Sequence, residues 1–71
     1  MISYNKLWKM LIDQGLNKTQ LMHLSGVSTN VIAKLGKSES VSLESIEKIC
    51  IALKCDIGDV VEIIVNEGAA K

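Results

Sequence analysis

The stretch NKTQLMHLSGVSTNVIAKL, residues 17–35, is the most informative part of the sequence about the fold. Asn17 can cap a helix, and Gln20 stands three residues later, as in a capping box. Gly26 suits the left-handed residue that ends this helix, and Ser28 can cap the next one. The stretch therefore predicts two short helices joined by a sharp turn.

The two helices differ in what they are expected to bury. Leu21 and Leu24 mark the buried side of the first helix, and Val27 can plug the angle between the pair. The second helix, residues 29–35, has an apolar inner face and an outer face of short polar side chains with one lysine. The inner face consists of Ile32 and Leu35 with Val31 at its margin, and the outer face consists of Thr29, Asn30, Ala33 and Lys34. This pattern is typical of a helix-turn-helix, whose second helix enters the major groove of DNA.

Upstream of this motif, residues 4–14 predict another helix. Its apolar positions recur at helical spacing, at Tyr4, Leu7, Trp8, Leu11 and Ile12. Ser3 can cap its start, and Gly15 can take the left-handed position after its end.

Downstream, a polar loop over 37–40 leads to a helix over 43–53, which Ser42 can cap. Its apolar stripe comprises Leu43, Ile46, Ile49, Cys50 and Leu53, with Lys54 in the last turn. Asp56 and Asp59 predict a fifth, short helix that carries Ile57, Val60 and Val61. Residues 62–65 are rich in β-branched side chains and suit a short C-terminal strand, or equally a continuation of the fifth helix. We expect an all-α, five-helix domain over 1–66 and a frayed tail over 67–71.

Composition narrows the class of protein. The chain has 71 residues and 48% apolar side chains, which fits one small folded domain. No apolar run approaches the ~20 residues of a membrane span, and no signal peptide is evident at the N-terminus, so we expect a cytoplasmic protein without membrane contact. Cys50, Cys55 and the single histidine, His23, lack the spacing of a metal site. No catalytic arrangement is apparent, so we expect no enzyme, no cofactor and no small-molecule ligand.

The formal net charge is zero, but the charges are unevenly distributed. Residues 1–37 hold five lysines and one aspartate, whereas residues 38–71 hold three lysines and seven acidic residues. Such a division favours one side facing a polyanion, although small proteins often segregate charge without any functional reason.

The sequence resembles the phage-repressor/Cro-like (Xre-type) helix-turn-helix family of transcriptional regulators. The resemblance is carried by Thr19-Gln20-Leu21, Ser25-Gly26-Val27-Ser28, Ile32, Leu35 and Gly36, and by the segment 41–59. It covers residues 3–62, nearly the whole chain. Met22 departs from the family pattern, because many relatives have alanine there. The resemblance implies a sequence-specific double-stranded DNA-binding regulator, a repressor in the first instance.

Candidate DNA contacts divide into base-reading and phosphate-binding groups. Asn can bond adenine and Lys can bond guanine, while Thr or Ala can meet a thymine methyl group. The base-reading candidates are Thr29, Asn30, Ala33 and Lys34. The phosphate candidates are Lys18, Thr19 and Gln20 at a helix start, Ser28 at the next cap, and Lys37, Ser38 and Ser40 in the loop.

Two questions stay open from the sequence. Ile63, Ile64 and Val65 are candidates for a homodimer interface, or they fold back beside Trp8. The same fold could also serve as a protein-interaction module, such as an antitoxin or anti-repressor. Salt dependence separates these functions, because phosphate contacts release counterions.

Overall fold

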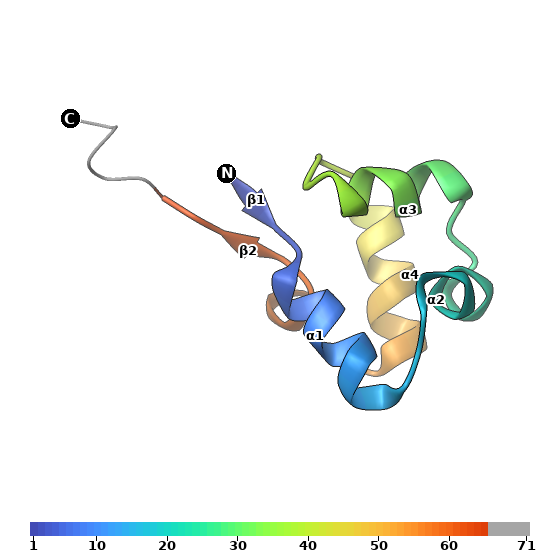
Figure 1. The fold of residues 1–71 in the computed structure, drawn as a ribbon. Helices are drawn as coiled ribbons and strands as arrows, with labels where there is room; N and C mark the ends of the chain where they lie inside the picture. The colour runs from blue at the N-terminus through green and yellow to red at the C-terminus, as the bar shows by residue number, and fades with distance from the viewer. Residues whose placement is uncertain (66–71) are drawn as a thin grey trace.

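A computed structural model describes residues 1–65 (Figure 1), so the frayed tail expected over 67–71 lies outside the described residues. In chain order the elements are β1 (Ile2–Ser3), α1 (Asn5–Gln14), α2 (Lys18–Ser25), α3 (Thr29–Gly36), α4 (Leu43–Leu53), the 3₁₀ turn η1 (Ile57–Asp59) and β2 (Glu62–Ile63). The described part of the chain is thus mostly helical with one short pair of strands.

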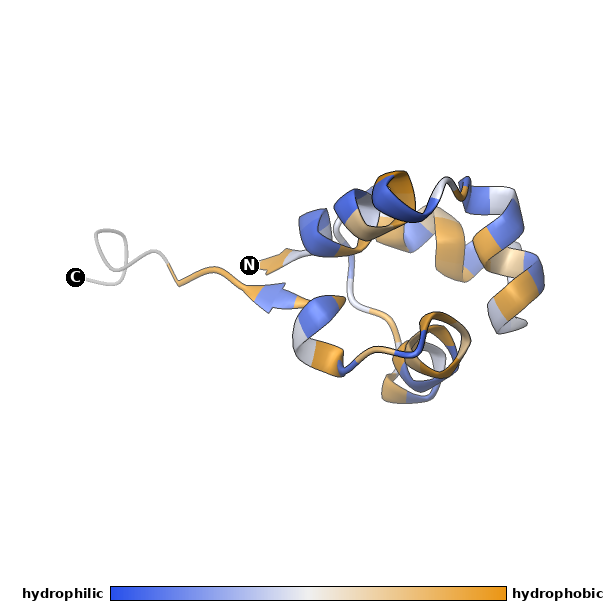
Figure 2. Ribbon diagram, turned by 90° about the horizontal axis from the view of Figure 1, so that it is seen from below, coloured by the Kyte–Doolittle hydropathy of each residue, from blue (hydrophilic) through white to orange (hydrophobic). Residues whose placement is uncertain are grey.

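The helices enclose a single apolar core, to which every one of them contributes. Leu7 of α1, Leu21 of α2, Leu35 of α3 and Ile49 of α4 have no solvent exposure. Hydrophobic and hydrophilic residues alternate around the helices in Figure 2, as expected for amphipathic helices that bury one side. Val27 is also buried, which confirms its predicted place in the angle between α2 and α3.

The prediction of five α-helices is wrong, because the expected fifth helix is only the 3₁₀ turn η1. Asp56 and Asp59 do form a reciprocal capping box there, with Asp56 N donating to Asp59 Oδ2 at 3.1 Å. The turn does not extend into a helix because Gly58 and the β-branched Val60 disfavour one. Val60 is instead fully buried, and the chain turns away toward β2.

A short C-terminal strand does form, and its partner is the N-terminal segment. β1 and β2 pair antiparallel, with Ile2 opposite Ile63 and Ser3 opposite Glu62. The Ile64 amide donates to the Met1 carbonyl at 2.8 Å, and the Met1 ammonium donates to the Ile64 carbonyl at 3.1 Å. The tail therefore pairs with the chain's own N-terminus, and the pair extends away from the helices (Figures 1 and 2).

Several local predictions need correction. Ser3 does not cap α1: Tyr4 holds the cap position without a side-chain bond, and Ser3 Oγ accepts from the Asn5 amide at 3.3 Å. Lys54 is the left-handed C-cap of α4 rather than a residue of its last turn.

Three residues assigned to apolar stripes are exposed, namely Ile12, Leu24 and Leu43, at 77%, 58% and 73%. Each lies at the edge of its stripe, where periodicity predicts a direction but no neighbouring element covers the side chain.

Candidate nucleic-acid interface

The helix-turn-helix is built by the local interactions that the sequence predicts. Asn17 Oδ1 accepts from the Gln20 amide at 2.8 Å, and Gln20 Oε1 accepts from the Asn17 amide at 2.9 Å. Gly26 has φ +79°, and its amide donates to the Met22 carbonyl at 2.9 Å. Ser28 caps α3 by accepting from the Val31 amide at 3.3 Å. The start of α2, its end and the start of α3 are therefore each fixed by hydrogen bonds.

The predicted base-reading residues share the exposed side of α3. Thr29, Asn30, Ala33 and Lys34 are all exposed, whereas Leu35 is fully buried. Val31 and Ile32 are half-buried and pack against the core. The predicted orientation of this helix is confirmed, and its exposed side offers an amide, an ammonium group, a hydroxyl and a methyl group.

Met22, the departure from the family pattern, fits between the two helices of the motif. It is half-buried, and its sulfur accepts a hydrogen bond from Thr29 Oγ1 at 3.6 Å. The Thr29 hydroxyl therefore has a partner on α2, which links the two helices of the motif.

The phosphate candidates at the start of α2 are exposed, but their side chains differ in availability. Lys18 and Thr19 occupy the first turn, where backbone N–H groups and the helix dipole favour an anion. The oxygen of Gln20 is engaged in the capping box, so its NH₂ group is the part that can donate to a phosphate. Ser28 similarly uses its oxygen as the cap of α3.

The loop after α3 is ordered by its own backbone. The Lys37 amide donates to the Ala33 carbonyl at 3.2 Å, and the Glu39 amide donates to the Lys34 carbonyl at 2.9 Å. Lys37, Ser38 and Ser40 are exposed, and Ser38 adopts a left-handed φ of +57°. The loop thus presents the three predicted phosphate contacts from a defined conformation, immediately beyond α3.

A contact that the sequence did not predict ties this loop to the N-terminus. The Tyr4 hydroxyl donates to the Glu39 carbonyl at 2.7 Å, across 35 residues of sequence. Tyr4 is only 2% exposed, and burial raises the pKa of its hydroxyl. Helical spacing identified Tyr4 as a core residue, but no local pattern could identify the loop carbonyl as its partner.

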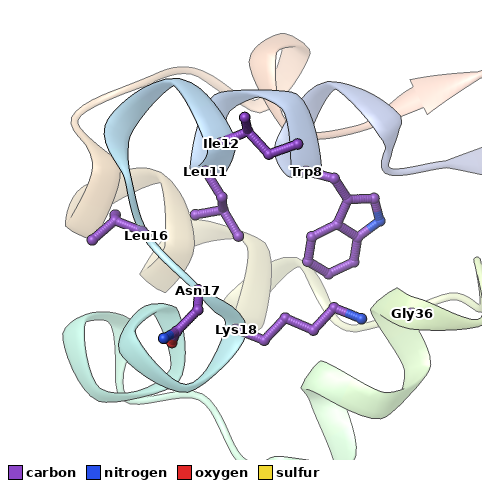
Figure 3. Close-up of a pocket in the computed structure, with 7 residues that line it drawn as sticks. All are labelled: Trp8, Leu11, Ile12, Leu16, Asn17, Lys18 and Gly36. Atoms are coloured by element: carbon purple, nitrogen blue, oxygen red, sulfur yellow. The ribbon is translucent and has the colours of Figure 1, made fainter.

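A second unpredicted contact joins α1 to α2 beside an open cleft of about 330 Å³ (Figure 3). The Lys18 ammonium lies 4.8 Å from the centre of the Trp8 ring. Trp8 is half-buried on α1, so its ring serves the core and this contact together. Helical spacing predicts a core position for Trp8 but not this contact with Lys18.

The candidate interface residues include Lys18, Lys34 and Lys37, and Glu39 lies in the same loop as Lys37. The other acidic residues of 38–65 lie on α4, in and before η1, and on β2. Within residues 1–65, no three His, Cys, Asp or Glu side chains cluster as metal ligands, and no helix is long and apolar enough to cross a bilayer.

Comparisons with known proteins agree with this geometry. The model of the Cro/C1-type helix-turn-helix DNA-binding domain matches residues 6–66. Among solved structures, the crystal structure of the transcriptional regulator VanUg is similar, with a TM-score of 0.86 and 49% sequence identity. That match covers 92% of this chain and 87% of the other. No curated protein matches the chain.

Proposed function

The chain belongs to the Cro/C1-type helix-turn-helix DNA-binding family, and we propose that it reads a specific duplex sequence with α3 in the major groove. The observation that carries this proposal is the exposed side of α3, which presents Thr29, Asn30, Ala33 and Lys34 beside the start of α2. We further propose repression as the mode of action, because occupying a promoter is sufficient to exclude polymerase and needs no additional surface.

Within this proposal, base reading and phosphate contact fall to different residues. Asn30 has the amide that pairs with adenine, and Lys34 can donate to guanine acceptors. The DNA phosphate backbone is contacted from the start of α2 by Lys18, Thr19 and Gln20. It is also contacted from the start of α3 by Ser28, and from the loop after α3 by Lys37, Ser38 and Ser40. Contacts at both ends of α3 would fix its register in the groove.

The first experiment is selection of bound duplexes from a random library, at low and at moderate salt. An enriched sequence that is retained at moderate salt is expected. If no duplex is retained even at low salt, DNA binding is refuted and the protein-interaction module becomes the better interpretation.

Single substitutions, tested on the selected site, then distinguish residues that contact base edges from residues that contact phosphates. Asn30→Ala and Lys34→Ala should each cost about 1–3 kcal/mol of specific binding free energy, because each removes a base-edge contact. Lys18→Ala should weaken all duplexes alike and reduce the slope of log K against log salt by about 1. Lys48→Ala is the matched control, since Lys48 lies on α4 in an exposed pair with Glu44. An unchanged affinity of Asn30→Ala would show that α3 is not the reading helix.

We propose that the protein binds its operator as a homodimer through the strand pair. Ile63 and Val65 are 62% and 69% exposed, and Ile64 is 42% exposed, which is costly for so many neighbouring apolar side chains. Ile63 also borders a groove of about 330 Å³, whose other apolar lining residues come from the N-terminal segment, the loop before α4, α4 itself and the segment around η1. A second copy is the favoured occupant, because two-residue strands have unpaired edges that can pair with the same edge of a partner across a two-fold axis.

Light scattering tests the homodimer with single substitutions. Ile63→Lys and Val65→Lys should give the mass of a monomer, while Ile51→Lys should leave the dimer intact. Ile51 is the matched control because it is 71% exposed but lies on α4. A monomeric wild-type protein, or dimers in all three variants, would remove the strand pair from the interface.

A further inference from the structure

The contact between Lys18 and Trp8 places a cation of the candidate interface against the one tryptophan of the chain. A separation of 4.8 Å between Nζ and the ring centre lies within the ~6 Å range of a cation–π interaction. The ring comes from α1 and the lysine from the first residue of α2, so the contact depends on how these two helices pack.

The ammonium group also reaches the end of α3. A methyl group built on Gly36, the last residue of α3, would lie 3.5 Å from Lys18 Nζ. Figure 3 shows the lysine side chain extending beneath the Trp8 ring, with its nitrogen directed toward Gly36. The charge is thus held where α1, α2 and α3 meet, at one border of the cleft.

Among the described residues, the Lys18 ammonium group has an aromatic ring as its partner, and not a carboxylate. Lys18 is the one charged residue among those that line the cleft in the described part of the chain. An aromatic ring orients an ammonium group through its quadrupole, whereas a carboxylate would neutralise it. Lys18 is also exposed, so its full positive charge stays accessible to a phosphate.

Orientation has value for a lysine because its side chain is long and flexible. A free lysine loses rotamer entropy when it binds a phosphate, and a side chain that is already held loses less. We propose that Trp8 is a positioning residue for DNA binding, whose ring holds the Lys18 ammonium beside the end of α3. This inference rests on the proposed DNA-binding function.

The test compares two substitutions of Trp8 in two backgrounds, with affinity for a random-sequence duplex as the measurement. Trp8→Leu keeps apolar bulk but removes the ring, whereas Trp8→Phe keeps an aromatic face. We expect Trp8→Leu to weaken binding about two- to fivefold, and Trp8→Phe to retain most of the affinity. In the Lys18→Met background, the same two substitutions should have equal and negligible effects on binding.

A merely structural role of Trp8 predicts a different result. Both substitutions would then lower the midpoint of thermal unfolding, and Trp8→Leu would weaken binding equally in the wild-type and Lys18→Met backgrounds. That equality would overturn the proposal, provided that binding is measured well below each midpoint and circular dichroism confirms the helices.

A measurement without DNA keeps this inference separate from the function on which it rests. Trp8 is the one tryptophan of the chain and lines the cleft, so tryptophan fluorescence reports directly on the cleft. Lys18→Met should change the emission spectrum of the free protein, and an unchanged spectrum would overturn the positioning contact alone. Absence of duplex binding by the wild type, with a changed spectrum in Lys18→Met, would instead overturn the DNA-binding function and with it the positioning role.

Discussion

Replacing Tyr4 by phenylalanine tests how the loop after α3 is held. The hydroxyl makes a 2.7 Å hydrogen bond to the Glu39 carbonyl from a side chain that is 2% exposed. Phenylalanine preserves the ring in the core, so the substitution removes the hydrogen bond and little else. It leaves the Glu39 carbonyl without this donor in a partly buried position.

The magnitude follows from these two effects. A hydrogen bond contributes about 0.5–1.5 kcal/mol net, and an abandoned buried acceptor costs about 1–3 kcal/mol. Since this carbonyl is only partly buried and water can reach it, we expect a loss of about 1–2 kcal/mol in the free energy of unfolding. For a domain of this size, that corresponds to a decrease of roughly 4–16 °C in the unfolding midpoint.

Urea denaturation followed by Trp8 fluorescence measures this loss. The midpoint should decrease at an unchanged slope m, because the surface exposed on unfolding stays the same. DNA affinity should also decrease, since the loop presents Lys37, Ser38 and Ser40. A change below about 0.3 kcal/mol would refute the reasoning, because it would mean that water replaces the hydroxyl without cost.

Other perturbations have equally direct expectations. Gly26→Ala should destabilise the protein by about 1–2 kcal/mol because of its left-handed φ of +79°, whereas Gly58→Ala, with open space and no positive φ, should have little effect in the same denaturation assay. Asn17→Ala should cost about 1 kcal/mol by removing the capping box of α2, and an unchanged midpoint would contradict that role. Burial raises the pKa of Cys55 from 9.0 to about 11, so the folded state retains a proton that the unfolded state releases. The stability that this provides is present below pH 9 and is lost as the pH rises toward 11, and Cys55→Ala should reduce that loss in thermal melts at pH 8 and pH 11.

The accuracy of the sequence-based expectations depended on the range of the interactions involved. The caps Asn17, Ser28 and Ser42 and the left-handed Gly26 were predicted correctly, because each is satisfied within three or four residues. The exposed side of α3 was also predictable, since Ile32 and Leu35 fix which side faces the core. Its contacts with DNA remain a prediction that the variants above will test.

Predictions failed where a distant segment decides the outcome. Ile12, Leu24 and Leu43 match helical periodicity yet are exposed, because burial depends on which element packs over a residue. The expected fifth helix is only the turn η1, and the chain beyond it pairs with β1, a partner that lies at the other end of the described sequence.

The helix-turn-helix can be predicted without any tertiary information, because its caps, turn and apolar spacing are all encoded within residues 17–35. Three contacts follow from the tertiary fold alone: the N-terminus pairs with residues 62–64, Tyr4 bonds to the loop after α3, and the Trp8 ring contacts the Lys18 ammonium. The physical reason is the sequence separation of the partners. A hydrogen bond over three residues depends on local backbone angles, whereas a contact over 35 residues forms only once the core has brought its two ends together.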